Sequence, residues 1–396
     1  MFSKRTNWTL EENAYTRALQ RHRDAGKRIF DLTASNPTEC GFRYDAAAIL
    51  ASLGDPAALR YEPEPKGLLG ARAAVAEYYR DKSVEVAREN LILTTGTSEA
   101  YSFLFRLLCE PGDEVLIAHP SYPLFEFLAT IQDVTLRPFP IVYDHGWQID
   151  FEGLQAAIGA RTRAIILVHP NNPTGHFVAS GEAERLNAIC AERDLALIVD
   201  EVFLDYELKQ SRAQRTRHGS FAANAGALTF ALSGLSKIAG LPQMKLGWIA
   251  ASGPGAAVRE SMARLEVIAD TYLSLSTPLQ CALPALLAQR KTMQKQILAR
   301  VEANLAELDE QLALQKVAGR LEVEGGWYAV LRVPAVQPDE ELAIRLLEER
   351  GVLVHPGHFY DFAGSGYLVI SLLTPAEEFR EGIGALLEIS NRKLEM

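Results

Sequence analysis

The sequence lacks the features of a membrane or secreted protein. Its 396 residues contain no apolar run near the roughly 20 residues that a membrane-spanning helix needs. The first ten residues, MFSKRTNWTL, lack the apolar stretch of a secretory signal. These two absences predict a soluble, cytoplasmic protein.

Cysteine is scarce, and the four residues lie far apart without a CxxC pair: Cys40, Cys109, Cys190 and Cys281. This spacing predicts reduced thiols and gives no sign of a disulfide framework or a zinc site. His355 and His358 are close together, but no cysteine or acidic pattern completes a metal site around them. We therefore predict no metal.

Positive charge is also in short supply. The 40 lysines and arginines against 50 aspartates and glutamates leave a net charge of −10. Binding to the phosphates of nucleic acids requires a basic face, so this balance argues against nucleic acid as the main partner. A local basic cluster lies in a Ser-, Gln-, Ala- and Asn-rich stretch that is typical of a solvated surface loop: Lys209, Arg212, Arg215 and Arg217.

The two commonest nucleotide-binding motifs are missing, since the chain has neither GxxxxGK[ST] nor GxGxxG. The nearest glycine-containing turn, TTGTSEA at 94–100, lacks the lysine of the first motif. The strand-like ALIVDEVF at 196–203 resembles the acidic strand of nucleotide hydrolases. Without its partner motif it does not predict nucleotide hydrolysis.

What the chain does have is a series of short apolar runs, and 48% of its residues are apolar. The runs are LILT (91–94), VLIA (115–118), AIILV (164–168), ALIV (196–199), TFAL (229–232) and GWIA (247–250). They are apolar throughout, which is typical of strands covered on both faces. Helical patterns separate them, so the sequence predicts an α/β fold with a mostly parallel sheet.

The pattern changes after residue 290. An apolar stripe predicts one long helix at 292–316. Beyond it, EGGWYAVLRV, VLVH and GYLVISLL are typical of strands, and DEELAIRLLEER is typical of a helix closed by Gly351. We predict a large domain at 45–290 and a small α+β domain built from 1–44 and 291–396.

Polar residues follow several of the apolar runs. LILT leads to Gly96, AIILV to HPNNPTG, ALIV to Asp200, and TFAL to Ser233 and Lys237. Each could be ordinary turn or helix-capping chemistry. Together they place a lysine, an aspartate, an asparagine and a helix N-terminus at one edge of the sheet, where ligands of open α/β sheets bind. A lysine in an apolar setting must be neutralised, paired or covalently used.

These motifs, in this order, resemble the class I and II aminotransferases. The resemblance rests on TTGTSEA, PSYP, HPNNPTG, DEVF and SGLSKIAGLPQMKLGW, and it extends from SNPT (35–38) to VHPG (354–357). It implies fold type I of the pyridoxal-phosphate (PLP) transferases, with a large α/β domain and a smaller α+β domain. It also implies the cofactor pyridoxal 5′-phosphate.

The resemblance assigns three central residues. Lys237 is the lysine that forms a Schiff base with the cofactor and later moves a proton at the substrate. Asp200 pairs with the pyridine nitrogen and keeps it protonated. Asn172 donates a hydrogen bond to the phenolic oxygen of the ring.

The same resemblance places the 5′-phosphate at the turn of Gly96, Thr97 and Ser98, where free N–H groups and the helix dipole favour an anion. Ser233 or Ser236 adds a further hydroxyl.

Two tyrosines complete the implied cofactor site. Tyr122 of PSYP resembles the aromatic residue that stacks on the pyridine ring. Tyr61 resembles a tyrosine that reaches the phosphate of the neighbouring subunit, which implies a homodimer with shared active sites.

Three positions depart from the family pattern. Lys245 stands where the family usually has a phosphate-binding arginine, so the bidentate fork is lost while the charge remains. Phe203 replaces a tyrosine that bonds to the phenolic oxygen. Val369, in GYLVIS, replaces the arginine that binds the α-carboxylate of the substrate. Four residues could take over this last role: Arg43, Arg60, His355 and His358.

The resemblance predicts transfer of an amino group from an amino acid to a 2-oxo acid. A β-lyase, a decarboxylase or a racemase would use the same cofactor residues, and a non-catalytic ligand-sensing protein would keep the fold. The absence of arginine between Arg264 and Arg290 disfavours an acidic side chain on the substrate. Trp327 and Tyr328 fit either an apolar wall of the site or the core.

Overall fold

The computed structural model describes residues 1–209 and 216–392. Arg212 and Arg215 of the basic cluster therefore lie outside the described residues. Arg217 is not a solvated residue as predicted, because its Nε lies 3.1 Å from the buried carboxylate of Glu324. No helix of the described chain is long and apolar enough to cross a membrane.

The large sheet has eight strands in the order β2-β9-β8-β7-β6-β3-β4-β5. Its strands are β2 (Leu91–Thr94), β3 (Glu114–His119), β4 (Thr135–Tyr143), β5 (Trp147–Ile149), β6 (Thr162–Val168), β7 (Ala196–Asp200), β8 (Thr229–Gly234) and β9 (Gly247–Ser252). The five strands from β8 to β4 are parallel, and β9 and β5 run antiparallel to their neighbours. All six predicted strands are confirmed, and the sheet is mostly parallel as predicted.

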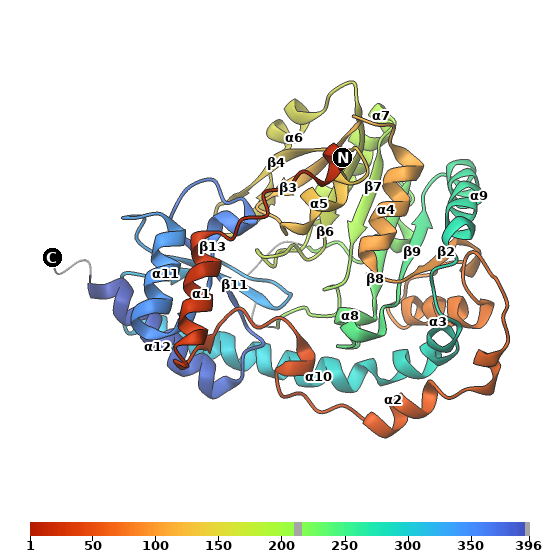
Figure 1. Ribbon diagram of the computed structural model, residues 1–396. Coiled ribbons are helices and arrows are strands. Elements are labelled where there is room, and N and C mark those ends of the chain that lie inside the picture. Colours follow the sequence, from red (N-terminus) through yellow and green to blue (C-terminus); the bar gives the residue numbers. More distant parts are fainter. Residues whose placement is uncertain (210–215, 393–396) are drawn as a thin grey trace.

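Helices cover both faces of this sheet (Figure 1). They are α3 (Leu69–Arg80), α4 (Thr97–Leu108), α5 (Leu124–Thr130), α6 (Phe151–Ala157), α7 (Ser180–Arg193), α8 (Leu235–Ile238) and α9 (Gly255–Tyr272), whereas α2 (Ala46–Ser52) packs against α10 (Thr277–Ala313). In β6, Ile165 and Leu167 pack in the core with α7, whereas Ala164 and Ile166 pack in the core with α4 and α9. Because neighbouring residues of a strand point to opposite faces, a continuous apolar run is needed to fill both layers.

A second, four-stranded sheet lies in the C-terminal part of the chain, in the order β10-β11-β14-β13. Its strands are β10 (Gly319–Arg320), β11 (Tyr328–Arg332), β13 (His355–Pro356) and β14 (Tyr367–Ser371). The helices α1 (Ala14–Asp24), α11 (Asp339–Arg350) and α12 (Ala376–Arg392) lie beside it in Figure 1. Gly351 ends α11 in the left-handed conformation, as the sequence predicts.

The N-terminal segment packs with this second unit. The short strand β1 (Phe30–Asp31) pairs in parallel with β12 (Val352–Leu353). Helix α1 lies against α11, whereas the N-terminus lies over the large sheet near α5 (Figure 1), where Trp8 contacts Phe127.

The predicted helix at 292–316 is longer at its start than expected, because α10 spans Thr277–Ala313. It passes through Pro284 and is continuous across residue 290, the predicted end of the large domain. Figure 1 shows α10 running along the base of the molecule from α3 toward α12. This helix holds the two sheets against each other, and the candidate site lies where they meet.

Candidate active site

The carboxyl edge of the large sheet carries the predicted site residues. Asp200 is the last residue of β7, and Ser233 lies near the end of β8. Lys237 follows in the single turn of α8. Because β7 and β8 are parallel neighbours, Asp200 and Lys237 emerge at the same edge.

Asp200 is a buried carboxylate that accepts hydrogen bonds from two donors in the described chain. The N–H of Val202 donates to Oδ1 at 3.1 Å, and the hydroxyl of Tyr101 donates to Oδ2 at 3.3 Å. Burial raises the pKa of Asp200 to about 6, against the lowering effects of these bonds and of the Lys237 ammonium. A cation in contact with this carboxylate would reverse the shift, so the residue is suited to pair with a protonated ring nitrogen.

Lys237 lies in an aromatic environment. Its Nζ is 5.1 Å from the ring centroid of Trp327 and 5.8 Å from that of Phe203. Burial lowers the pKa of Lys237, and the charge of Asp200 opposes this shift. A lysine with a lowered pKa is more often unprotonated at neutral pH, and the free amine is the nucleophilic form.

The turn at Gly96 forms a backbone cradle. Gly96 has φ of +156°, which favours glycine, and α4 begins after it without a side-chain cap. A Cβ on Gly247 of β9 would lie 3.0 Å from the Cα of Gly96. The close approach of these two backbones leaves the first N–H groups of α4 free for an anion beside the end of β8.

The other predicted phosphate residues are found around this cradle. Thr97 opens α4 and is half-buried, whereas Ser98 is exposed. Ser236 is half-buried in α8. Lys245 is exposed and sits in the left-handed conformation two residues before β9, whose Gly247 pairs with Thr94.

Four buried polar atoms without a hydrogen-bond partner in the described chain gather around the same edge: Ser121 Oγ, Asn172 Oδ1, Ser233 Oγ and Trp327 Nε1. An unsatisfied buried polar group costs about 1–3 kcal/mol, so such groups require an explanation. Asn172 follows β6, and Ser121 precedes Tyr122. A polar ligand lying between Lys237 and the Gly96 turn would account for them, and pyridoxal phosphate has the matching groups.

The charge of Asp200 acts on Tyr122. Burial raises its pKa, and the carboxylate of Asp200 contributes to the shift. Tyr122 is 41% exposed, and its ring contacts Phe125 edge-on at 6.3 Å between centroids.

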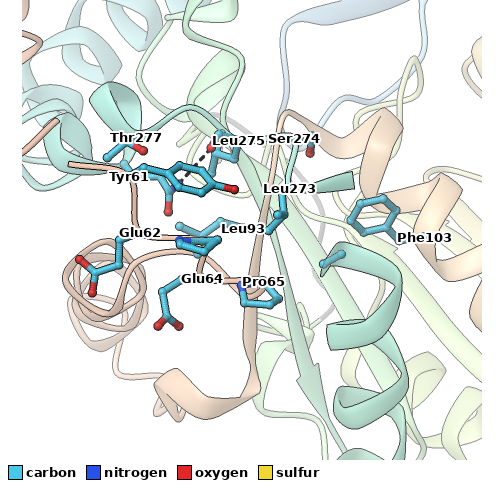
Figure 2. A pocket seen from close by; sticks show the side chains of 14 residues that line it. Tyr61, Glu62, Glu64, Pro65, Leu93, Phe103, Leu273, Ser274, Leu275 and Thr277 are labelled. Carbon is cyan, nitrogen blue, oxygen red and sulfur yellow. Dashed lines mark hydrogen bonds between the residues drawn. The ribbon is translucent and has the colours of Figure 1, made fainter. Parts of the chain in front are cut away.

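Tyr61 is not brought to the Lys237 site of its own chain. Its side chain is 77% exposed and lines a separate pocket together with Glu62, Glu64 and Leu273 (Figure 2). This position is consistent with a residue that acts on another copy of the chain.

Two of the three positions that depart from the family pattern, Phe203 and Val369, are buried. Phe203 is buried against Trp327 and Tyr328. Trp327 is fully buried and its ring lies near the Nζ of Lys237, so it belongs to the core and also forms part of the apolar wall of the site. Val369 is fully buried in β14.

Sequence reasoning missed three tyrosines at the site. Tyr101 bonds to Asp200, and Tyr206 donates its hydroxyl to the carbonyl of Lys237 at 2.5 Å. Tyr360 lies 3.1 Å from the ring of His355. Tyr101 lies on α4, Tyr206 in a loop and Tyr360 in a short 3-10 helix, and no spacing rule in the sequence connects them to the motifs.

Comparisons with known proteins agree with this geometry. A family model described as "Aminotransferase class I and II" matches residues 43–386. Among curated proteins, the chain is 25% identical over 372 residues to the glutamate-pyruvate aminotransferase AlaA of Haemophilus influenzae, covering 92% of this chain and 91% of that one. It is 29% identical over 341 residues to the aspartate/prephenate aminotransferase of Thermus thermophilus, covering 84% of each.

Solved structures show the same fold. The alanine aminotransferase of Pyrococcus furiosus aligns with a TM-score of 0.85 at 22% identity, over 99% of this chain and 100% of that one.

Proposed function

The chain belongs to the class I and II aminotransferases, a PLP-dependent family of transaminases, and on this premise we propose that Lys237 and Asp200 perform its chemistry. It transfers an amino group from an amino acid to a 2-oxo acid. The observation that carries the residue assignment is that half-buried Lys237 and buried Asp200 emerge at one sheet edge, beside polar atoms that lack partners in the described chain.

When bound, pyridoxal phosphate supplies an aldehyde that captures an amine and a ring that accepts the electron pair of the substrate's α-carbon. The Nζ of Lys237 would hold this aldehyde until the substrate's amino group takes its place. The freed amine would then remove and return a proton at the α-carbon, since its lowered pKa suits it to act as a base near neutral pH.

The other residues bind and orient the cofactor. Asp200 would hold the proton on the ring nitrogen, and Asn172 would donate a hydrogen bond to the phenolic oxygen. Tyr122 would cover one face of the ring. Gly96, Thr97 and Ser98 would hold the phosphate, with Ser233, Ser236 and the charge of Lys245 nearby.

Half-reaction spectra test the function. We expect an amino acid to convert the coloured holoenzyme to the pyridoxamine form, and a 2-oxo acid to restore the colour. A stable pyridoxamine form that a 2-oxo acid converts back to the coloured form distinguishes amino transfer from the reactions of a β-lyase, a decarboxylase or a racemase. Colour without turnover of any member of a broad amino-acid panel would favour a ligand-sensing protein instead.

Phe203→Tyr is expected to lower the pKa of the coloured Lys237 link. Phe203 is buried with its ring 5.8 Å from Nζ, and a hydroxyl there would donate to the phenolic oxygen and reduce its hold on the iminium proton. Titration of the cofactor absorbance in both proteins measures this pKa. Identical titration curves would contradict the role of position 203.

We also propose a cytoplasmic homodimer in which Tyr61 acts on the partner's phosphate. The four cysteines are free, which fits a reducing compartment. Large apolar side chains are exposed near Tyr61, among them Leu59, Leu69 and Tyr272. Such a patch is typical of a protein interface.

Mixing two defective chains tests this arrangement. Tyr61→Ala is expected to weaken cofactor binding, and Lys237→Ala to abolish turnover. A mixed dimer has one site that carries both changes and one intact site, so the mixture should recover activity at limiting cofactor. A monomer in sedimentation, or no recovery after subunit exchange, would contradict shared sites.

A further inference from the structure

One face of the small sheet is turned toward Lys237. In this antiparallel sheet Val330 lies opposite Val369, and Val369 lies opposite His355. Directly opposed residues share a face, and so do residues two apart on one strand, which adds Tyr328. The ring of Tyr328 packs edge-on against Phe203 at 6.3 Å between centroids, and Phe203 faces Lys237. His355 is therefore on the face that closes the site.

This face carries Arg332, two residues after Val330 on β11, but Arg332 is exposed at the end of the strand and its guanidinium lies over the ring of Tyr367, 5.5 Å from the centroid. Position 369 holds a buried valine. Arg43 and Arg60 are exposed, and so is His358. Of the four residues that the sequence offered as substitutes, His355 is the one that lies beside position 369 in the sheet.

His355 forms a donor pair with Tyr360, which lies in the short helix η7 (Gly357–Tyr360). The Nδ1 of His355 is 3.1 Å from the hydroxyl oxygen of Tyr360. If the hydroxyl donates to Nδ1, the Nε2–H of the ring is free to donate. If Nδ1–H donates instead, the tyrosine hydroxyl keeps its own proton for another acceptor. In either tautomer the pair offers one donor.

The pair is held close to the cofactor residues. The carbonyl of Tyr360 accepts a hydrogen bond from the N–H of Ser121 at 3.0 Å, next to Tyr122. Burial raises the pKa of Tyr360, and Tyr328 and Tyr122 add to this shift. Burial lowers the pKa of His355, and Asp31 opposes this shift. A carboxylate bound beside the ring would favour its protonated form and so gain a charged partner.

We infer that His355, together with Tyr360, binds the carboxylate of the amino-acid or 2-oxo-acid substrate. This inference rests on the proposed function, because the carboxylate can reach His355 only if the amino group reacts at Lys237. A hydrogen-bonding histidine thus performs in this chain the task that the buried valine at position 369 cannot perform.

The test compares an acid with a neutral ligand of the same shape. Binding of 3-phenylpropionate and of 3-phenylpropanamide to the holoenzyme is measured by calorimetry, because neither ligand carries a reactive amine. His355→Phe keeps ring volume and removes the donor. We expect it to weaken acid binding about tenfold or more, as for loss of a hydrogen bond to a charged group, and to leave amide binding nearly unchanged.

Matched variants isolate the donor. His355→Gln retains an N–H group and should keep acid affinity within a few-fold of wild type, while Tyr360→Phe should weaken acid binding. Arg60→Ala should have no effect. Equal acid binding by wild type and His355→Phe, or a loss confined to Arg60→Ala, would overturn the inference.

A second measurement does not depend on whether His355→Phe folds. In holoenzyme with ¹⁵N-labelled histidine, the acid but not the amide should move one imidazole signal toward the imidazolium position, and that signal should be missing in His355→Gln. No such change would overturn the inference even if His355→Phe fails to fold. Failure of the proposed function would be recognised by a different result, because the wild-type protein would then form no coloured link between Lys237 and the cofactor.

Discussion

Lys237→Ala is expected to lower the rate of amino transfer by about 10⁴-fold or more, since it removes both the covalent anchor and the base that moves the proton. Nζ lies near the rings of Trp327 and Phe203 and is affected by the charge of Asp200, and no second lysine is described in that environment. A coupled assay of 2-oxo-acid formation measures the rate. The absorbance of the covalent link should disappear in the same variant.

Lys295→Ala is the matched control for this change. Lys295 is exposed on α10, so its loss removes one positive charge without touching the site. It should retain the wild-type rate and absorbance. A Lys237→Ala protein that still transfers amino groups at a rate near wild type would contradict the assignment of the nucleophile.

Asp200→Asn is expected to lower the rate at least about a hundredfold while the protein still binds the cofactor. The loss of one charged hydrogen bond of roughly 3 kcal/mol in the transition state corresponds to this factor. The asparagine can still accept from the Val202 N–H, so the fold of the strand end should persist. Without a carboxylate, the ring nitrogen loses its proton and accepts electrons poorly.

The adjacent acid provides the control for Asp200. Glu201 is also buried, and burial raises its pKa to about 7, but its carboxylate accepts hydrogen bonds from Ser220 and Phe221. Glu201→Gln should therefore change stability more than rate. Single-turnover kinetics with a deuterated α-carbon separates the effects, because only Asp200→Asn should slow the proton-transfer step. An equal loss in both variants would contradict a specific role for Asp200.

Local patterns were sufficient to predict the cofactor side of the site. The apolar runs of β7 and β8 identify two buried strands, and the polar residues that follow them mark the binding edge without any tertiary information. Asp200 and Lys237 could be found in this way because the chemistry is located at strand ends. The roles of Asn172 and Tyr122 needed the family resemblance, since their motifs also fit ordinary turns.

The substrate side could not be predicted from local patterns. His355 and Val369 are adjacent only through the antiparallel register of β13 and β14. Tyr360 lies at the end of the short 3-10 helix η7, and no periodic pattern in the sequence predicts where this helix lies. The sequence could offer four substitutes for a carboxylate-binding arginine, and the register of a small sheet distinguishes them.

Proline explains why β4 and the first part of α10 were not predicted from the sequence. The strand β4 contains Pro138 and Pro140, and proline is unusual inside a strand because it lacks an N–H donor. The helix α10 continues through Pro284, where a break is normally expected. Packing of Leu283, Leu286 and Leu287 into the core stabilises the first part of that helix despite the lost hydrogen bond.

Borohydride reduction of the coloured holoenzyme, followed by proteolysis and mass spectrometry, tests the central claim most directly. The account predicts a single pyridoxyl group, attached to the peptide that contains Lys237. A colourless protein after incubation with pyridoxal phosphate, or a label on any other lysine, would contradict it.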